Sequence, residues 1–173
     1  MTGFEELEKR VIIEWGGATV KWHQGTKHDK EVVAIEPRGQ IRQPFRDYLD
    51  FTLTYPELKE LYSNPDGNAE WRSRLSAVAG VYLILATTTG DQYVGSASGA
   101  EGIWGRWANY ARDGAGENVL LNKLLDRDPA YPAAFSYSIL QVLPNTYARS
   151  EVLACERRYK DKLGCRAKGL NAN

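Results

Sequence analysis

The sequence predicts an α+β fold, in which a small antiparallel three-stranded β-sheet is flanked by helices and preceded by an N-terminal α/β extension that contains a β-hairpin. Two observations predict the sheet. The alternating apolar segments 80–87 and 92–97 are separated by a four-residue polar loop, a pattern typical of a hairpin. Residues 135–142 alternate in the same way after an interval of helical periodicity, which indicates a third strand.

The N-terminal extension is predicted to span residues 1–78, leaving residues 79–173 as the second unit. It begins with a short charged stretch that favours a helix. Two alternating segments follow, at residues 19–24 and 31–36, with six polar residues between them. Alternation on both sides of a polar loop predicts a second hairpin. A chain of 173 residues can fold as one domain with such an extension.

The rest of the extension carries helix signals. Thr54 and Glu57 have the spacing of a capping box, in which each side chain accepts from the backbone of the other residue. The helix that starts there would bury Leu58 and Leu61, and residues 64–67, which read Asn-Pro-Asp-Gly, predict a turn after it. A second helix is expected to place three apolar residues on one side: Trp71, Leu75 and Val78.

The register of the central hairpin follows from its loop. A loop at residues 88–91 pairs Thr87 with Gln92, and side chains alternate between the two faces of a strand. One face should carry Tyr82, Ala86, Tyr93, Gly95 and Ala97. The other should carry Val81, Leu83, Leu85 and Val94, and should form the core. The tyrosine face, with its small residues, is expected to leave room for another molecule to approach.

A helix beginning near Ile103 is predicted next. Its buried stripe, at helical spacing, is Trp104, Trp107, Ala108 and Ala111. Arg106 and Tyr110 should lie one turn apart on a different side, together with Asn109. Residues 114–116 read Gly-Ala-Gly and should end the helix. A further helix is expected over residues 117–125, before the third strand.

The last predicted helix, residues 149–163, contains an anomaly. Its apolar stripe is Val152, Cys155, Tyr159 and Leu163. Glu156 falls inside that stripe, although burial of a lone carboxylate is costly unless a cation meets it. One interpretation is an ion pair with an arginine such as Arg106, or a position at the helix edge near water. The other interpretation is a metal ligand.

Composition restricts the classes of function. Lys and Arg balance Asp and Glu at 22 each, so bulk charge does not indicate a nucleic-acid binder. From Tyr147 onward, seven basic residues stand against three acidic ones, which suits either a phosphate-facing surface or a solvated helix. Cys155 and Cys165 are too few for a disulfide framework and lack zinc-site spacing, as do the histidines His23 and His28. No signal peptide or membrane span is apparent, so a cytoplasmic protein is expected.

Five features occur in an informative order. Residues 80–82 read Gly-Val-Tyr and residues 93–95 read Tyr-Val-Gly; Arg106, Glu156 and Asn171 follow. This ordered set resembles the GIY-YIG nuclease family, whose two tripeptide motifs precede an arginine helix, a glutamate helix and a terminal asparagine. Both motifs here have Val for Ile, which preserves a β-branched apolar residue. The resemblance implies a small sheet with helices packed around it, which agrees with the elements predicted above.

The resemblance also implies a catalytic site. Glu156 would hold one divalent ion per site, Mg²⁺ or Mn²⁺, and Arg106 would stabilise the scissile phosphate. Tyr82 would act as the general base or orient the attacking water; its ordinary pKa near 10 makes it a poor base without help. Tyr93 and Tyr110 would position the phosphate and water, and Asn171 would close the site. Magnesium often needs only one or two protein carboxylates, so a single glutamate suffices.

The function implied is a metal-dependent endonuclease that hydrolyses phosphodiester bonds in double-stranded DNA, with restriction or another defence against foreign DNA as its role. The alternatives are a nucleic-acid-binding module that does not cleave, and an RNA nuclease or toxin-like nuclease. Four basic residues are candidates to follow the DNA backbone: Arg157, Arg158, Lys160 and Lys168. Residues 1–78 are a candidate DNA-recognition or dimerisation segment, since double-strand cleavage by one-site monomers requires a homodimer or two successive events.

Overall fold

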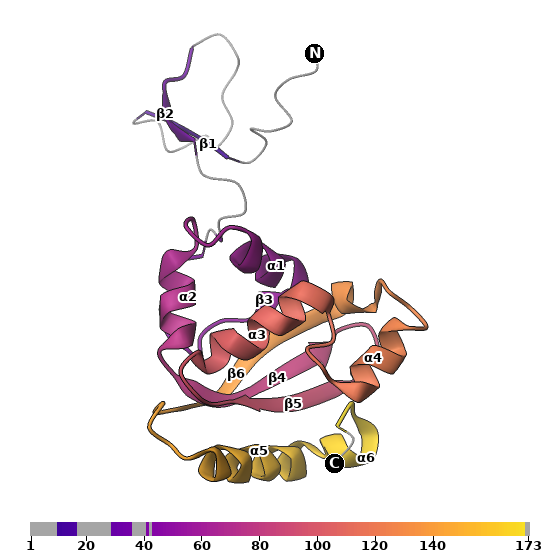
Figure 1. Cartoon of the computed structure of the whole chain (residues 1–173). Helices are drawn as coiled ribbons and strands as arrows, with labels where there is room; N and C mark the ends of the chain where they lie inside the picture. Colours follow the sequence, from indigo (N-terminus) through magenta and orange to yellow (C-terminus); the bar gives the residue numbers. More distant parts are fainter. Residues whose placement is uncertain (1–9, 17–28, 36–40, 42, 172–173) are drawn as a thin grey trace.

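A four-stranded antiparallel sheet lies between two layers of helices in the computed structural model of the chain (Figure 1). The structure describes residues 10–16, 29–35, 41 and 43–171. The strand order is β3-β6-β4-β5, and the strands are β3 (Leu53–Thr54), β4 (Ala79–Ala86), β5 (Gln92–Ala97) and β6 (Phe135–Leu143). The predicted α+β class is confirmed. The prediction of three strands was one too few, because β3 pairs with the outer edge of β6.

The helices divide between the two faces of the sheet. One face is covered by α1 (Tyr55–Ser63), α2 (Ala69–Ser76), α3 (Gly102–Asp113) and α4 (Val119–Leu125). The other face is covered by α5 (Arg149–Leu163) and the short α6 (Cys165–Lys168) (Figure 1). Sequence periodicity placed α5 at these same bounds. In the described part of the chain, no helix is both long enough and apolar enough to cross a membrane.

A separate two-stranded ribbon precedes this sheet. Strand β1 (Val11–Ile13) pairs antiparallel with β2 (Val32–Ile35). The predicted strand at residues 31–36 is therefore present, but its described partner is β1, not the segment 19–24. That segment lies outside the described residues, as does the helix expected at the start of the chain.

The cap and turn signals after the ribbon act as predicted. The Thr54 hydroxyl accepts from the backbone N–H of Glu57, whose carboxylate accepts from the Thr54 backbone N–H at 2.7 Å. Residues 64–67 form the turn, in which the N–H of Gly67 donates to Asn64 Oδ1. Helix α2 then buries Trp71 and Leu75. It ends at Ser76, two residues before Val78, which still packs against the core.

The β4–β5 hairpin has the predicted faces in a different register. The Ala86 N–H donates to the Asp91 carbonyl, and Tyr82 lies opposite Gly95. The turn is thus displaced by one residue, and every cross-strand pair differs by two residues from the prediction. A shift of two positions preserves the alternation of side chains. Tyr82 and Tyr93 therefore share a face of the hairpin, as expected.

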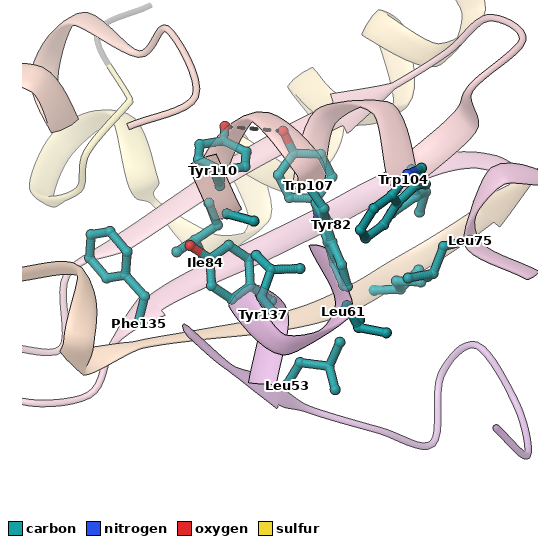
Figure 2. Packing of buried hydrophobic residues seen from close by; sticks show 14 of the residues in the cluster. Leu53, Leu61, Leu75, Tyr82, Ile84, Trp104, Trp107, Tyr110, Phe135 and Tyr137 are labelled. Carbon is teal, nitrogen blue, oxygen red and sulfur yellow. Dashed lines mark hydrogen bonds between the residues drawn. The ribbon is translucent and has the colours of Figure 1, made fainter. Parts of the chain in front are cut away.

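The tyrosine face is the larger core, which contradicts the prediction that it is open. Tyr82, Trp107, Tyr110 and Tyr137 are fully buried there, and Figure 2 shows their rings together. Tyr110 was expected to lie away from the buried stripe of α3. It is buried because α3 contacts α1 and α2 as well as the sheet, so a wider arc of the helix is covered than the stripe of Trp104, Trp107, Ala108 and Ala111.

A smaller core fills the space between the other face of the sheet and α5. Its buried members are Ala79, Val81, Val94, Leu143, Val152, Cys155 and Cys165. Leu163 was predicted to join them but is 42% exposed. Gly164, with φ of 65°, ends α5 at that point. The chain then turns back, and Cys165 is buried instead of Leu163. Both cysteines are free.

Residues on both sides of Val78 contribute to the larger core. Phe51, Leu53, Leu61 and Leu75 belong to the same buried cluster as Tyr82. The division at Val78 therefore does not separate two cores. A separate role for residues 1–78 stays a prediction, and the part from Phe51 onward is built into the sheet and its helical layer.

Candidate active site

The glycines of the two tripeptide motifs let the hairpin and its neighbours pack closely. A Cβ on Gly95 would lie 2.6 Å from the Tyr82 ring and hydroxyl, which is too close for a non-bonded contact. A Cβ on Gly80 would collide with the backbone carbonyl of Gln141 on β6 and approach Ile103 of α3. The motif therefore seats the Tyr82 ring over β5 and brings β6 against β4.

Tyr82 lies at the back of the site and has no exposed surface. Its hydroxyl is 3.2 Å from the Tyr110 hydroxyl (Figure 2). Burial raises the pKa of Tyr82, and the nearby phenol of Tyr93 raises it further. Burial likewise raises the pKa of Tyr110. Both phenols are therefore neutral near neutral pH. The predicted position of Tyr82 and Tyr110 at the substrate surface is wrong in this structure.

A cleft of about 630 Å³ opens beside β5, the edge strand of the sheet. Three residues that the sequence singled out line it: Tyr93, Arg106 and Glu156. Tyr93 reaches it from the face that α3 covers. Glu156 reaches it from α5, on the opposite face. The cleft is thus shared by the two faces, and the edge strand passes between them. Its other lining residues are Ser96, Ser98, Gly99, Asn145, Tyr147, Arg149 and Leu153.

Arg106 joins the buried phenols to the cleft. Its guanidinium lies over the Tyr110 ring at 5.9 Å, and Nη2 donates to the Gly116 carbonyl at 3.4 Å. Partial burial lowers the pKa of Arg106, but the neighbouring Tyr82 and Tyr110 raise it more, so the net shift is upward. The guanidinium therefore stays charged. Its ion pair with Glu117, at 3.7 Å, is exposed and contributes little.

The anomalous carboxylate of Glu156 is engaged at both oxygens. Oε1 lies 2.7 Å from the ammonium of Lys160, one turn later on α5. Oε2 accepts a hydrogen bond from the Ser96 hydroxyl. The two charged side chains are only 13% and 10% exposed. An ion pair was one of the two interpretations for Glu156, and the described cation is Lys160, not Arg106.

The cleft offers only oxygen donors to a metal ion. The Glu156 carboxylate is joined by the hydroxyls of Tyr93, Ser96 and Ser98 and by the amide of Asn145. Among the described residues, no group of three or more His, Cys, Asp or Glu side chains could hold a metal. One carboxylate in a polar, open cleft fits Mg²⁺ or Mn²⁺, which accept oxygen ligands and, for Mg²⁺, retain several waters. It does not fit a structural zinc site.

Asn171 does not lie in the cleft. Its Oδ1 accepts from the Val94 N–H at 2.9 Å, and its Nδ2 donates to the Val94 carbonyl at 2.8 Å. The side chain thus pairs with the outer edge of β5 as a neighbouring strand would, and it is buried. The expectation that Asn171 closes the site is corrected on this geometry: both of its polar atoms are used to hold the edge strand.

The basic residues of α5 do not form one surface. Arg157 and Arg158 are exposed, and Arg158 contacts the sulfur of Cys155. Lys160 is buried against Glu156, so the expectation that it follows a DNA backbone is wrong. The side chain of Lys168 lies outside the described part of the structure. The cationic side chains that do line the cleft are Arg106 and Arg149.

Sequence reasoning missed several cleft residues. Ser96 directly follows the second tripeptide motif, and strand alternation from Val94 places it on the α5 face, so its position next to Glu156 had a readable signal. Asn145, Tyr147 and Arg149 belong to the connection into α5 and its first residue. No periodic pattern marks such a connection, and only the folded chain brings it to the cleft.

Comparisons with known proteins find likeness in solved structures. No family model matches the chain, and no curated protein matches it. The catalytic domain of the homing endonuclease I-TevI is 25% identical at a TM-score of 0.43, over 55% of this chain and 98% of that one. A mutant of the I-TevI catalytic domain is 24% identical at a TM-score of 0.44, over 56% and 94%.

The two tripeptide motifs occupy adjacent strands of an antiparallel sheet, and Arg106 and Glu156 come from helices on its two faces. This is the arrangement of elements that the motif order implied. In its motifs and in its α+β fold, the chain resembles the GIY-YIG nucleases.

Proposed function

We propose that the chain is a metal-dependent endonuclease that hydrolyses phosphodiester bonds in DNA. One observation carries the proposal: a single cleft gathers Tyr93, Arg106 and Glu156 from β5, α3 and α5. A charged guanidinium, a carboxylate and a phenol in one open polar cleft are the groups that phosphodiester hydrolysis needs. The order of the sequence motifs supports the same reading.

Arg106 would bind the scissile phosphate. Its guanidinium can donate two hydrogen bonds to phosphate oxygens, and its charge would stabilise the negative charge that develops on them in the transition state. Glu156 would hold the divalent ion, which when bound supplies a Lewis acid for the phosphate and its bound water. Tyr93, whose side chain reaches the cleft from β5, would orient the attacking water.

Tyr82 would act indirectly. Its hydroxyl contacts Tyr110 rather than the cleft, and burial raises its pKa, so proton abstraction by Tyr82 is unfavourable in this arrangement. Its nearness to Arg106 gives it another role. We assign to Tyr82 and Tyr110 the role of positioning the Arg106 guanidinium from its buried side. The other side of the guanidinium then faces the cleft, where it would bind the phosphate.

DNA is the proposed substrate, with double-stranded DNA first. The cleft is lined by two arginines, Arg106 of α3 and Arg149 of α5, and phosphate backbones are bound by such cations. Cleavage of both strands would require two copies of the one-site unit or successive events. Restriction or another defence against foreign DNA is the proposed role, and residues 1–78 are the proposed recognition or dimerisation segment.

The test is incubation of the purified chain with plasmid DNA, single-stranded DNA and RNA, with Mg²⁺ or with a chelator. We expect nicking or linearisation of the plasmid only when the metal is present. Arg106→Ala should lower the cleavage rate by about a hundredfold or more. Arg112→Ala is the matched control, because Arg112 lies on the same helix, pairs with Asp113 and does not line the cleft; it should cleave as the parent chain does.

Other outcomes distinguish the rival functions. Binding without cleavage under every metal condition would support a nucleic-acid-binding module and reject the enzyme. Cleavage of RNA alone would support an RNA nuclease or a toxin-like nuclease. Cleavage that is unchanged by the chelator would reject the metal-dependent mechanism.

A further inference from the structure

The buried ion pair on α5 bears directly on how the cleft binds a metal. Glu156 is the cleft's only described carboxylate, and both of its oxygens already have partners. Lys160 contacts Oε1 at 2.7 Å, and Ser96 donates to Oε2. An ion that coordinates this carboxylate directly must therefore change at least one of these contacts.

We propose that Lys160 is a resident counter-ion that holds Glu156 in the metal-free protein, competes with the divalent ion for the carboxylate and is displaced when the ion binds. This inference rests on the proposed metal-dependent function. It assigns Lys160 to the control of metal affinity, in place of contact with nucleic acid.

The charges decide which partner is displaced. The Ser96 hydroxyl is neutral, and a carboxylate oxygen has more than one acceptor position, so the serine can keep its hydrogen bond beside a bound ion. Lys160 cannot keep its contact with Glu156 beside a bound ion without an electrostatic cost. A divalent ion on Glu156 would lie within a few ångströms of the ammonium, where like charges in a partly desolvated site repel strongly.

The surroundings of Lys160 agree with this role. Its side chain is 10% exposed, and it does not line the cleft among the described residues. It lies near Cys165, whose pKa it lowers against the larger upward effect of burial. A buried ammonium with one described carboxylate partner is poorly placed to bind a phosphate backbone. Its four-carbon stem is long enough to move the ammonium away from Glu156 toward solvent.

The test measures metal binding itself. Mn²⁺ and Mg²⁺ are titrated into the parent chain, Lys160→Met and Lys162→Met by calorimetry, without nucleic acid. We expect Lys160→Met to bind Mn²⁺ about tenfold more tightly or better, because a like charge is removed. Lys162→Met is the control, since Lys162 is exposed on the same helix and lies over the Tyr159 ring; its affinity should be that of the parent chain.

Thermal melting provides a second readout. Without metal, Lys160→Met should melt at a lower temperature than the parent, because Glu156 loses its counter-ion. The same excess of Mn²⁺ should raise its melting temperature by more than it raises that of the parent, since the stabilisation by a ligand increases with the logarithm of its affinity. Lys160→Gln removes the charge while keeping a donor for Glu156, and it repeats the test if the methionine variant does not fold.

The outcomes separate this inference from the proposed function. Equal or weaker metal affinity in Lys160→Met and Lys160→Gln, or no metal binding by any variant, would overturn the inference. Tighter Mn²⁺ binding with no cleavage of any nucleic acid would uphold it and reject the nuclease. Metal-dependent cleavage with unchanged affinity in the variants would uphold the nuclease and reject the role of Lys160.

Discussion

Glu156→Gln tests the ion pair and the proposed metal ligand together. The substitution deprives the Lys160 ammonium, whose side chain is 10% exposed, of the carboxylate at 2.7 Å. Breaking a buried ion pair costs about 3–5 kcal/mol. We expect about 2–3 kcal/mol, because Gln retains an acceptor oxygen and the pair is not fully buried. Each kcal/mol lowers Tm by about 2–4 °C in a chain of this size, so Tm should fall by about 4–12 °C.

A double variant separates stability from chemistry. Glu156→Gln combined with Lys160→Met removes both charges, and replacing both members of a buried pair is often neutral or stabilising. Most of the lost Tm should therefore return. Cleavage should not return, because the proposed metal ligand is still absent. Asp161→Asn is the control: Asp161 lies on the same helix in an exposed pair with Arg166, and its loss should change neither property.

Circular dichroism melts and single-turnover cleavage of plasmid DNA on the same four proteins would decide. Cleavage by Glu156→Gln at the parent rate would refute the metal-ligand assignment, whatever its Tm. An unchanged Tm in Glu156→Gln would refute the energetic importance of the Lys160 pair. Under the proposed displacement the two interpretations of Glu156 are compatible, since Lys160 would hold the carboxylate until an ion replaced it.

Three further predictions concern the site and core. Arg106→Ala should lower the single-turnover cleavage rate by about a hundredfold or more while weakening DNA binding much less; equal losses would make Arg106 only a phosphate anchor. Tyr137→Phe should keep or raise Tm, because its buried hydroxyl has no described hydrogen-bond partner; a clear fall in Tm would contradict this. Burial raises the pKa of Tyr82, Tyr110 and Tyr137, so stability should hold up to about pH 10 and decrease above it; a free energy of unfolding that stays constant well above pH 10 would contradict it.

Local signals accounted for most of the fold that could be predicted. The capping box of Thr54, the β4–β5 hairpin and the bounds of α5 each depend on residues close together in sequence. Strand β3 could not be predicted in this way. It has only two residues, too few for an alternating pattern, and it forms because β6 offers an unpaired edge.

The burial of Tyr110 was missed for a related reason. Helical periodicity identifies the apolar residues on one side of a helix, which face one neighbouring element. Helix α3 has neighbours on several sides, since it contacts α1, α2, β4 and β5. Burial by several layers is a property of the assembled fold, so periodicity within α3 alone underestimates it.

The sequence predicted which residues would share the cleft better than it predicted how they are arranged. Tyr93, Arg106 and Glu156 do share a cleft. The sequence argument placed Tyr82 and Tyr93 on one face of the hairpin and did not say from which face Glu156 approaches; Glu156 comes from α5, on the other face. The alternation of side chains along a strand does not show that residues from both faces of a sheet can reach one cleft around its edge strand. Asn171 had the correct place in the motif order, but its contact with Val94 depends on how the chain returns after α6.

Of the two motif tyrosines, Tyr82 is therefore buried and Tyr93 lines the cleft, and the positions of the motif glycines explain this difference. Gly95 has no side chain, and this leaves the space in which the Tyr82 ring lies. The glycine of the second motif thus allows the tyrosine of the first motif to be buried. Tyr93, at the other end of the second motif, stays at the cleft. A buried phenol with a raised pKa suits a fixed support for Arg106 better than it suits a base. If proton abstraction in this cleft uses one of the two motif tyrosines, Tyr93 is the one that lines it.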